Sequence, residues 1–309
     1  MRLVKCENDK LTIYLLFDLK NAFWFNHNNI SYLCQYYMKM ILVMKRISCL
    51  LAFCILVSLS FHSCRKTLSQ SQFNEFQLTS PDGMERSGGI YLPAGMKSDD
   101  RLPVIYMADG LVFKDCGFKK MIDSLIENRC ISPVIVACSF ENKKQVPGYK
   151  VAYRNAEYIE SLDRNNKEFV TLFDNHYTFF TTQFIPYIEK VAHVSDSRDD
   201  RLFFGTSNSA DFGITLSFRA PELMAEYWCY SPVFSNISGY GMLSETVSYR
   251  ICWGAKEEAG MFDYFPNLIK DIRKRGGNVH SWVFNGGHDR EWWKYWFGEE
   301  LKRRFPYKN

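Results

Sequence analysis

One serine of this chain has the sequence surroundings of a catalytic nucleophile. Residues 203–213 read FFGTSNSADFG, and Ser207 stands near the centre of this stretch. A strand-like apolar run (201–205) leads into Ser207, and a helical pattern (208–219) leaves it. A serine on such a turn exposes its hydroxyl, and the glycines of the G-x-S-x-G pattern relieve crowding between strand and helix. Ser209 replaces the last glycine, so an ordinary strand-to-helix turn is the competing interpretation.

A histidine is placed where it could act as the base for that serine. His288 follows Asn285-Gly286-Gly287 on a loop between a strand-like run and the final helical pattern. A serine hydroxyl needs a neighbouring base to remove its proton, and a loop at a strand end can bring one from elsewhere in the sequence. The sequence therefore predicts that His288 serves a nucleophilic serine.

A serine–histidine pair also needs a carboxylate to orient the histidine. Where the chain order is nucleophile, acid, histidine, the acid lies between the two and just beyond a strand. The strand-like run 248–255 is followed by Glu257, Glu258 and Asp263. Side chains alternate between the two faces of a strand, so neighbouring Glu257 and Glu258 cannot both face the histidine. The residues alone leave the choice open.

Backbone N–H groups are expected to bind the oxyanion that forms during acyl transfer. One is the N–H of the residue after the nucleophile, which is Asn208. The other comes from a loop after an earlier strand. Asp109-Gly110 closes the run 102–110, so we expect the Leu111 N–H to be the second donor.

Strand-like and helical patterns alternate over more than 200 residues. This alternation predicts an α/β fold with a doubly wound, mostly parallel sheet and helices on both faces. Ligands in such folds bind at the carboxyl ends of the strands, where the residues above lie. We expect residues 141–175 to form an irregular loop near the site. Residues 80–93 are predicted to form a turn that leads into a strand. The other predicted strands are 102–110, 132–140, 201–205, 224–232, 248–255 and 279–287, and predicted helices are 118–129, 176–194, 208–219, 262–277 and 289–305.

Composition and charge exclude several classes of function. The chain has 309 residues and a formal net charge of +4, with lysines and arginines scattered among acids. We therefore expect no nucleic-acid partner. Five of ten cysteines follow Cys64, and none lies at zinc-ligand spacing, so no metal site is predicted. Three of the five lie in apolar runs and are expected to be buried thiols, whereas Cys116 and Cys130 are the two that could pair.

The N-terminal residues differ from the rest of the chain. Residues 44–64 combine a basic start, an apolar run of about 15 residues and a terminal cysteine, and they resemble a bacterial lipoprotein signal peptide. Cys64 would then be lipidated, 1–43 would be a non-native upstream extension, and 65–309 would be the folded domain. We expect a lipid-anchored or periplasmic protein of the bacterial cell envelope. A membrane anchor formed by 1–64 is the alternative.

Five segments together resemble the putative-esterase family of α/β-hydrolases. They are YMADG, VAYRNAEY, GTSNSADFG, WGAKEE and GGHDREWW, and the resemblance covers roughly residues 75–305. The family includes enterochelin esterases, feruloyl esterases, S-formylglutathione hydrolase and mycolyltransferases. The resemblance implies the α/β-hydrolase fold and a serine hydrolase of carboxylic esters that forms an acyl-enzyme and needs no cofactor.

The resemblance also assigns individual residues. Family members place the acid three residues after the glycine that matches Gly254, which selects Glu257. Arg154, Glu157 and Tyr158 match a family R-x-x-E/D-Y block near the substrate pocket, although a solvated loop with one buried tyrosine would also explain them. Ser209 departs from the family's glycine.

These observations favour a small-molecule ester as substrate. We expect a bulky polar ester, such as a siderophore or a feruloyl or acyl sugar. Two alternatives stay open. One is an acyltransferase that uses the same triad, and the other is a catalytically inactive binding member of the fold, which Ser209 favours.

Overall fold

The computed structural model describes residues 38–44, 67–258 and 261–308. The chain divides into two units, Met1–Cys64 and Arg65–Asn309. Residues 38–44 are helical. The predicted signal segment beyond Met44, the predicted lipidation site Cys64 and most of the predicted upstream extension lie outside the described residues. In the described ranges, no helix is both long enough and apolar enough to cross a membrane.

A mixed eight-stranded sheet forms the frame of the second unit, in the order β1-β2-β4-β3-β5-β6-β7-β8. The first two pairings are antiparallel, and all the others are parallel. The predicted mostly parallel sheet is therefore confirmed. The strands are β1 (Gln72–Thr79), β2 (Glu85–Leu92), β3 (Val104–Met107), β4 (Ile135–Ser139), β5 (Arg201–Thr206), β6 (Glu226–Tyr230), β7 (Ser248–Gly254) and β8 (Asn278–Phe284).

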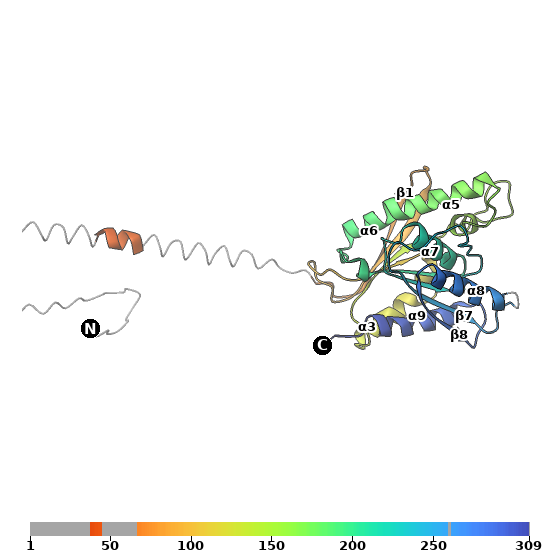
Figure 1. The fold of residues 1–309 in the computed structure, drawn as a ribbon. Coiled ribbons are helices and arrows are strands. Elements are labelled where there is room, and N and C mark those ends of the chain that lie inside the picture. Colours follow the sequence, from red (N-terminus) through yellow and green to blue (C-terminus); the bar gives the residue numbers. More distant parts are fainter. Residues whose placement is uncertain (1–37, 45–66, 259–260, 309) are drawn as a thin grey trace, which may run out of the picture. The chain divides into compact units, whose positions relative to one another are not determined.

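Helices cover both faces of the sheet, as predicted (Figure 1). Side chains alternate along a strand, so β3 feeds two cores. Val104 and Tyr106 belong to the core that also includes residues of α5 to α8, whereas Ile105 and Met107 belong to the core that also includes residues of α2, α3 and α9. The helices are α2 (Leu111–Asp115), α3 (Phe118–Glu127), α4 (Tyr153–Tyr158), α5 (Lys167–Phe179), the π-helical η2 (Phe180–Phe184), α6 (Ile185–Val191), the 3₁₀ turn η3 (Arg198–Asp200), α7 (Asn208–Arg219), α8 (Met261–Lys274) and α9 (Arg290–Arg304).

The segment 141–175 is more regular than the sequence predicted. It contains α4 and the first nine of the thirteen residues of α5, which begins at Lys167 instead of residue 176. The side chain of Asn166 accepts a hydrogen bond from the Glu168 N–H and so caps the helix. A buried apolar face then holds the helix against the sheet.

The five cysteines beyond Cys64 are all free thiols. Cys138, Cys229 and Cys252 are buried, as their apolar surroundings predicted. Cys116 and Cys130 form no disulfide in this structure.

Candidate active site

Ser207 occupies a strained turn between β5 and α7. Its backbone has φ 56° and ψ −129°, a conformation that residues other than glycine rarely adopt. The Ser207 N–H donates to the Tyr230 carbonyl at 2.9 Å, which ties the turn to β6. Gly205 is required because a Cβ there would lie 2.4 Å from the Ser209 carbonyl oxygen. The chain therefore forms the predicted strand–serine–helix turn.

Ser209, the residue that departs from the motif, closes this turn with its side chain. Its hydroxyl donates to the Thr206 carbonyl at 2.7 Å and accepts from the Thr206 N–H at 2.8 Å. The residue is fully buried. Both backbone groups of Thr206 thus find a partner within the turn, and a serine fits where glycine was expected.

Glu257 and His288 form a pair at the ends of the last two strands. Glu257 Oε2 lies 3.0 Å from His288 Nδ1. Glu257 Oε1 accepts from the Ser231 hydroxyl at 2.6 Å and from the Gly254 N–H at 2.8 Å. Burial alone would raise the pKa of Glu257, but the hydrogen bonds from His288, Gly254 and Ser231 outweigh it and hold that pKa below its ordinary value. The carboxylate is therefore ionised at neutral pH and orients the imidazole.

Backbone contacts bring these two loops together. The Ala255 N–H donates to the Phe284 carbonyl, and the Lys256 N–H donates to the Gly286 carbonyl, both at 2.8 Å. A Cβ on Gly254 would lie 2.2 Å from the Gly286 carbonyl oxygen, so only glycine permits this approach. Backbone hydrogen bonds thus hold the loop of Glu257 next to the loop of His288.

Trp293 and Ser231 also contact the Glu257–His288 pair. Neither residue was predicted from the sequence to belong to the site. The Trp293 ring packs edge-on against His288 with centroids 4.7 Å apart, and its Nε1–H donates to the Ser231 hydroxyl at 2.9 Å. Ser231 follows β6 with a φ of 49°. Since Nδ1–H of His288 donates to an ionised carboxylate, Nε2 remains free to accept a proton.

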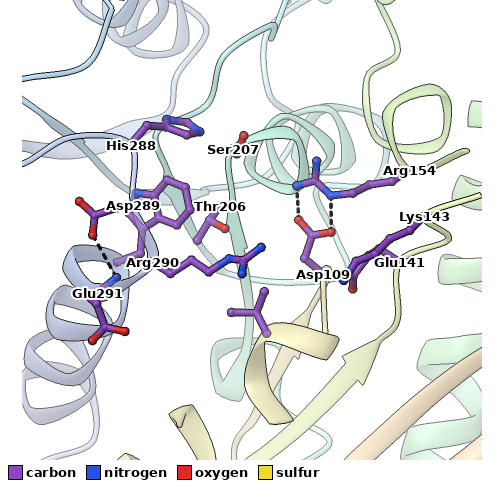
Figure 2. Close-up of a pocket in the computed structure, with 12 residues that line it drawn as sticks. Asp109, Glu141, Lys143, Arg154, Thr206, Ser207, His288, Asp289, Arg290 and Glu291 are labelled. Carbon is purple, nitrogen blue, oxygen red and sulfur yellow. Dashed lines mark hydrogen bonds and ion pairs between the residues drawn. The ribbon is translucent and has the colours of Figure 1, made fainter. Parts of the chain in front are cut away.

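Ser207 and His288 line the same cavity, whose volume is about 610 Å³. Figure 2 shows His288 on one side of Ser207 and the Asp109–Arg154 pair on the other. Most of the remaining lining is charged. The lining residues are Asp109, Val112, Glu141, Lys143, Arg154, Thr206, Ser207, His288, Asp289, Arg290, Glu291 and Trp293.

Of the three residues expected to bind substrate, only Arg154 lines this cavity. Its guanidinium pairs through two nitrogens with the Asp109 carboxylate, and the Nε–Oδ1 distance is 2.6 Å. Glu157 is buried and pairs instead with Arg86 at 2.8 Å. Tyr158 is fully buried, and its hydroxyl accepts from the Asp109 N–H at 3.3 Å. Glu157 and Tyr158 are therefore buried residues that do not line this cavity.

The two expected oxyanion donors differ in their surroundings. Within the described residues, the Asn208 N–H at the start of α7 has no hydrogen-bond acceptor. The Leu111 N–H donates to Glu141 Oε2 at 3.3 Å, and Lys143 Nζ pairs with the other oxygen at 3.1 Å. Glu141 was not predicted from sequence. In the part of the chain that the structure describes, no group of three His, Cys, Asp or Glu side chains could hold a metal ion.

Comparison with solved structures places this architecture among esterases. A ferulic acid esterase aligns with a TM-score of 0.59 and 18% identity over 77% of this chain and 98% of that chain. An S-formylglutathione hydrolase from Staphylococcus aureus aligns at 0.54 and 13% over 78% and 98%. The enterobactin esterase of Shigella flexneri aligns at 0.58 and 15% over 79% of this chain and 61% of its own. These likenesses confirm the α/β-hydrolase fold.

A family model supplies the sequence evidence. Comparison with curated proteins finds no match. The model described as Putative esterase matches residues 82–263, more than half of the chain. This range includes Ser207 and Glu257, and His288 lies beyond it. The chain therefore belongs to the Putative esterase family and is a carboxylic ester hydrolase.

Proposed function

We propose that Ser207, His288 and Glu257 form the catalytic triad of this hydrolase. The Ser207 hydroxyl attacks the ester carbonyl while His288 Nε2 takes its proton, and the same proton then passes to the departing alcohol. A water molecule then attacks the acyl-enzyme while His288 Nε2 takes its proton. The proton returns to the Ser207 oxygen, and the carboxylic acid is released. The observation that carries the proposal is the Glu257–His288 pair, fixed by hydrogen bonds beside the cavity that Ser207 lines.

The oxyanion would be bound by the N–H groups of Asn208 and Leu111. The unpaired Asn208 N–H stands at the N-terminus of α7, where the helix dipole also favours negative charge. At Leu111, the ester oxygen would take the place of the Glu141 carboxylate. Displacement of Glu141 is therefore part of productive binding in this proposal.

We further propose that the substrate is a bulky, polar ester. A cavity of about 610 Å³ lies within the range of small-molecule sites. Seven of its twelve lining residues are charged, which suits hydroxyl-rich or charged groups better than a lining of alkyl side chains would. Ferulic acid and enterobactin esters, named for two of the structural relatives, are compounds of this kind.

A lipid anchor at Cys64 in a bacterial cell envelope remains a proposal. It is supported by the basic, apolar and cysteine-terminated pattern of residues 44–64. Mass spectrometry of the purified full-length protein from a bacterial host tests it. A mature chain that starts at a diacylated Cys64 supports the anchor, and an unprocessed chain contradicts it.

The proposed reaction is tested with purified wild type and Ser207→Ala against a panel of carboxylic esters. Loss of a triad nucleophile lowers turnover about 10⁶-fold, so the variant should show no measurable hydrolysis. Retention of more than a few per cent of activity would contradict the assignment. Analysis of products with and without an added alcohol separates hydrolysis from acyl transfer. A wild type that cleaves no ester would support a binding protein instead.

A further inference from the structure

A second hollow lies beside Ser207, separate from the cavity described above. Its volume is about 300 Å³. It shares Ser207 and His288 with the larger cavity, so both open onto the same nucleophile. It is lined by Ser207, Asn208, Val233, Phe234, Glu257, Glu258, Met261 and His288.

The side chains that line the two spaces differ in type. Two polar side chains of the second hollow bind other residues: Glu257 binds His288, and the side-chain amide of Asn208 donates to Asn155 Oδ1 at 2.9 Å. Glu258 is exposed to solvent. The apolar part of the lining comes from Val233, Phe234 and Met261. The larger cavity, in contrast, is lined mainly by charged residues.

Phe234 shows that the apolar surface is held in place. Its side chain is 54% exposed, although its backbone is fixed on both sides. The Phe234 N–H donates to buried Asp211 at 3.0 Å, and the Phe234 carbonyl accepts from the Ser161 hydroxyl at 2.7 Å. The Ser235 hydroxyl donates to the same carboxylate at 2.6 Å. Because these hydrogen bonds fix the backbone that carries the Phe234 ring, less conformational entropy is lost when a ligand packs against the ring.

We propose that this hollow is a subsite for an apolar aryl or alkyl group of the ester. The scissile bond would lie over Ser207, with the apolar group against Phe234, Val233 and Met261 and the polar remainder in the larger cavity. The proposal rests on the role of Ser207 proposed above. The group is either the acyl part or the alcohol part, and the experiment distinguishes these two.

The experiment compares kcat/KM for two ester series by titration of the released acid. One series keeps methyl alcohol and varies the acyl group through acetate, butyrate and hexanoate. The other keeps acetate and varies the alcohol through methyl, phenyl and 2-naphthyl. The proteins are wild type, Phe234→Ala, Phe234→Leu and, as the matched control, Met242→Ala, which alters another exposed apolar side chain (70% exposed) outside both cavities.

In the wild type, the larger apolar ester should be favoured in one series. Phe234→Ala should reduce that preference at least about tenfold while the smallest ester changes little, because a single methylene in an apolar pocket is already worth roughly tenfold and the substitution removes a whole ring. Phe234→Leu should retain most of the preference, and Met242→Ala should retain all of it. The series that responds identifies the acyl or the alcohol side.

A preference that does not change in either series on Phe234→Ala would overturn the subsite. So would an equal loss on all esters of both series. Ser207→Ala in the same assay tests the nucleophile separately. If this variant still hydrolysed the esters, the proposed triad would be overturned, independently of the result for Phe234→Ala. A wild type that cleaves no ester would overturn both proposals.

Discussion

Replacing Glu257 by glutamine changes the hydrogen bonding of the His288 side chain while keeping the shape of the site. The carboxylate faces three donors: the Gly254 N–H, the Ser231 hydroxyl and His288 Nδ1. A glutamine has one acceptor oxygen and an NH₂ group that only donates. If the NH₂ group faced Gly254, two donors would lie about 2.8 Å apart without an acceptor. The oxygen should therefore stay with Gly254 and Ser231, and the NH₂ group should face His288.

This arrangement reverses the tautomer of the histidine. Nδ1 would accept from the amide, so the proton would move to Nε2, the atom that must take the Ser207 proton. Neutralising a triad acid lowers turnover about 10⁴-fold. At about 1.36 kcal/mol for each factor of ten, this corresponds to roughly 5 kcal/mol in the activation free energy.

The assay is kcat on one good ester substrate for Glu257→Gln, Glu258→Gln and Asp263→Asn, together with the melting temperature of each protein. Glu258 and Asp263 are exposed and do not contact His288, so their variants should remain within about twofold of wild type. Similar melting temperatures would show that the site is intact. Near-normal turnover of Glu257→Gln, with a collapse in either control, would refute this reasoning.

Two other substitutions test the scaffold around the nucleophile. Ser209→Ala should lower the free energy of unfolding by about 1–3 kcal/mol, because the backbone of Thr206 loses two buried hydrogen bonds. Hydrolysis should persist. Denaturant unfolding measures the first effect, and kcat measures the second. Burial raises the pKa of Asp211 to about 7 despite its hydrogen bonds from the Phe234 loop. Between its ordinary value and 7 the folded state therefore binds more protons than the unfolded state, so this group makes the protein less stable as pH rises. Melting temperatures across that interval should fall less steeply for Asp211→Asn than for wild type, and parallel slopes would contradict this.

Much of the site could be predicted because its residues follow strand ends. Ser207 directly follows one strand-like run and His288 lies on the loop after another, and parallel strands bring their carboxyl ends to one edge. Glu257 was less certain because Glu258 and Asp263 follow the same strand. Family spacing selected Glu257, and the structure places that residue against the histidine.

The contacts that support the site were beyond the sequence. Ser231 and Trp293 are 62 residues apart, and no spacing in the sequence links one to the other. The Glu141 contact with Leu111 joins the residues that follow β4 to the start of α2, segments 30 residues apart in the sequence. β1 was missed because an edge strand with mostly exposed residues has no clear apolar alternation. Glu157 and Tyr158 matched a motif, but α4 buries both while Arg154 faces the cavity.

The central claim is that Ser207 is the residue that becomes acylated. The most direct measurement is labelling of the purified wild type with a fluorophosphonate, which reacts with activated serines, followed by peptide mass spectrometry. The account predicts one adduct, on Ser207, that disappears in Ser207→Ala and forms far more slowly in His288→Ala. An adduct on another serine, or ester hydrolysis by a protein whose Ser207 stays unlabelled, would contradict it.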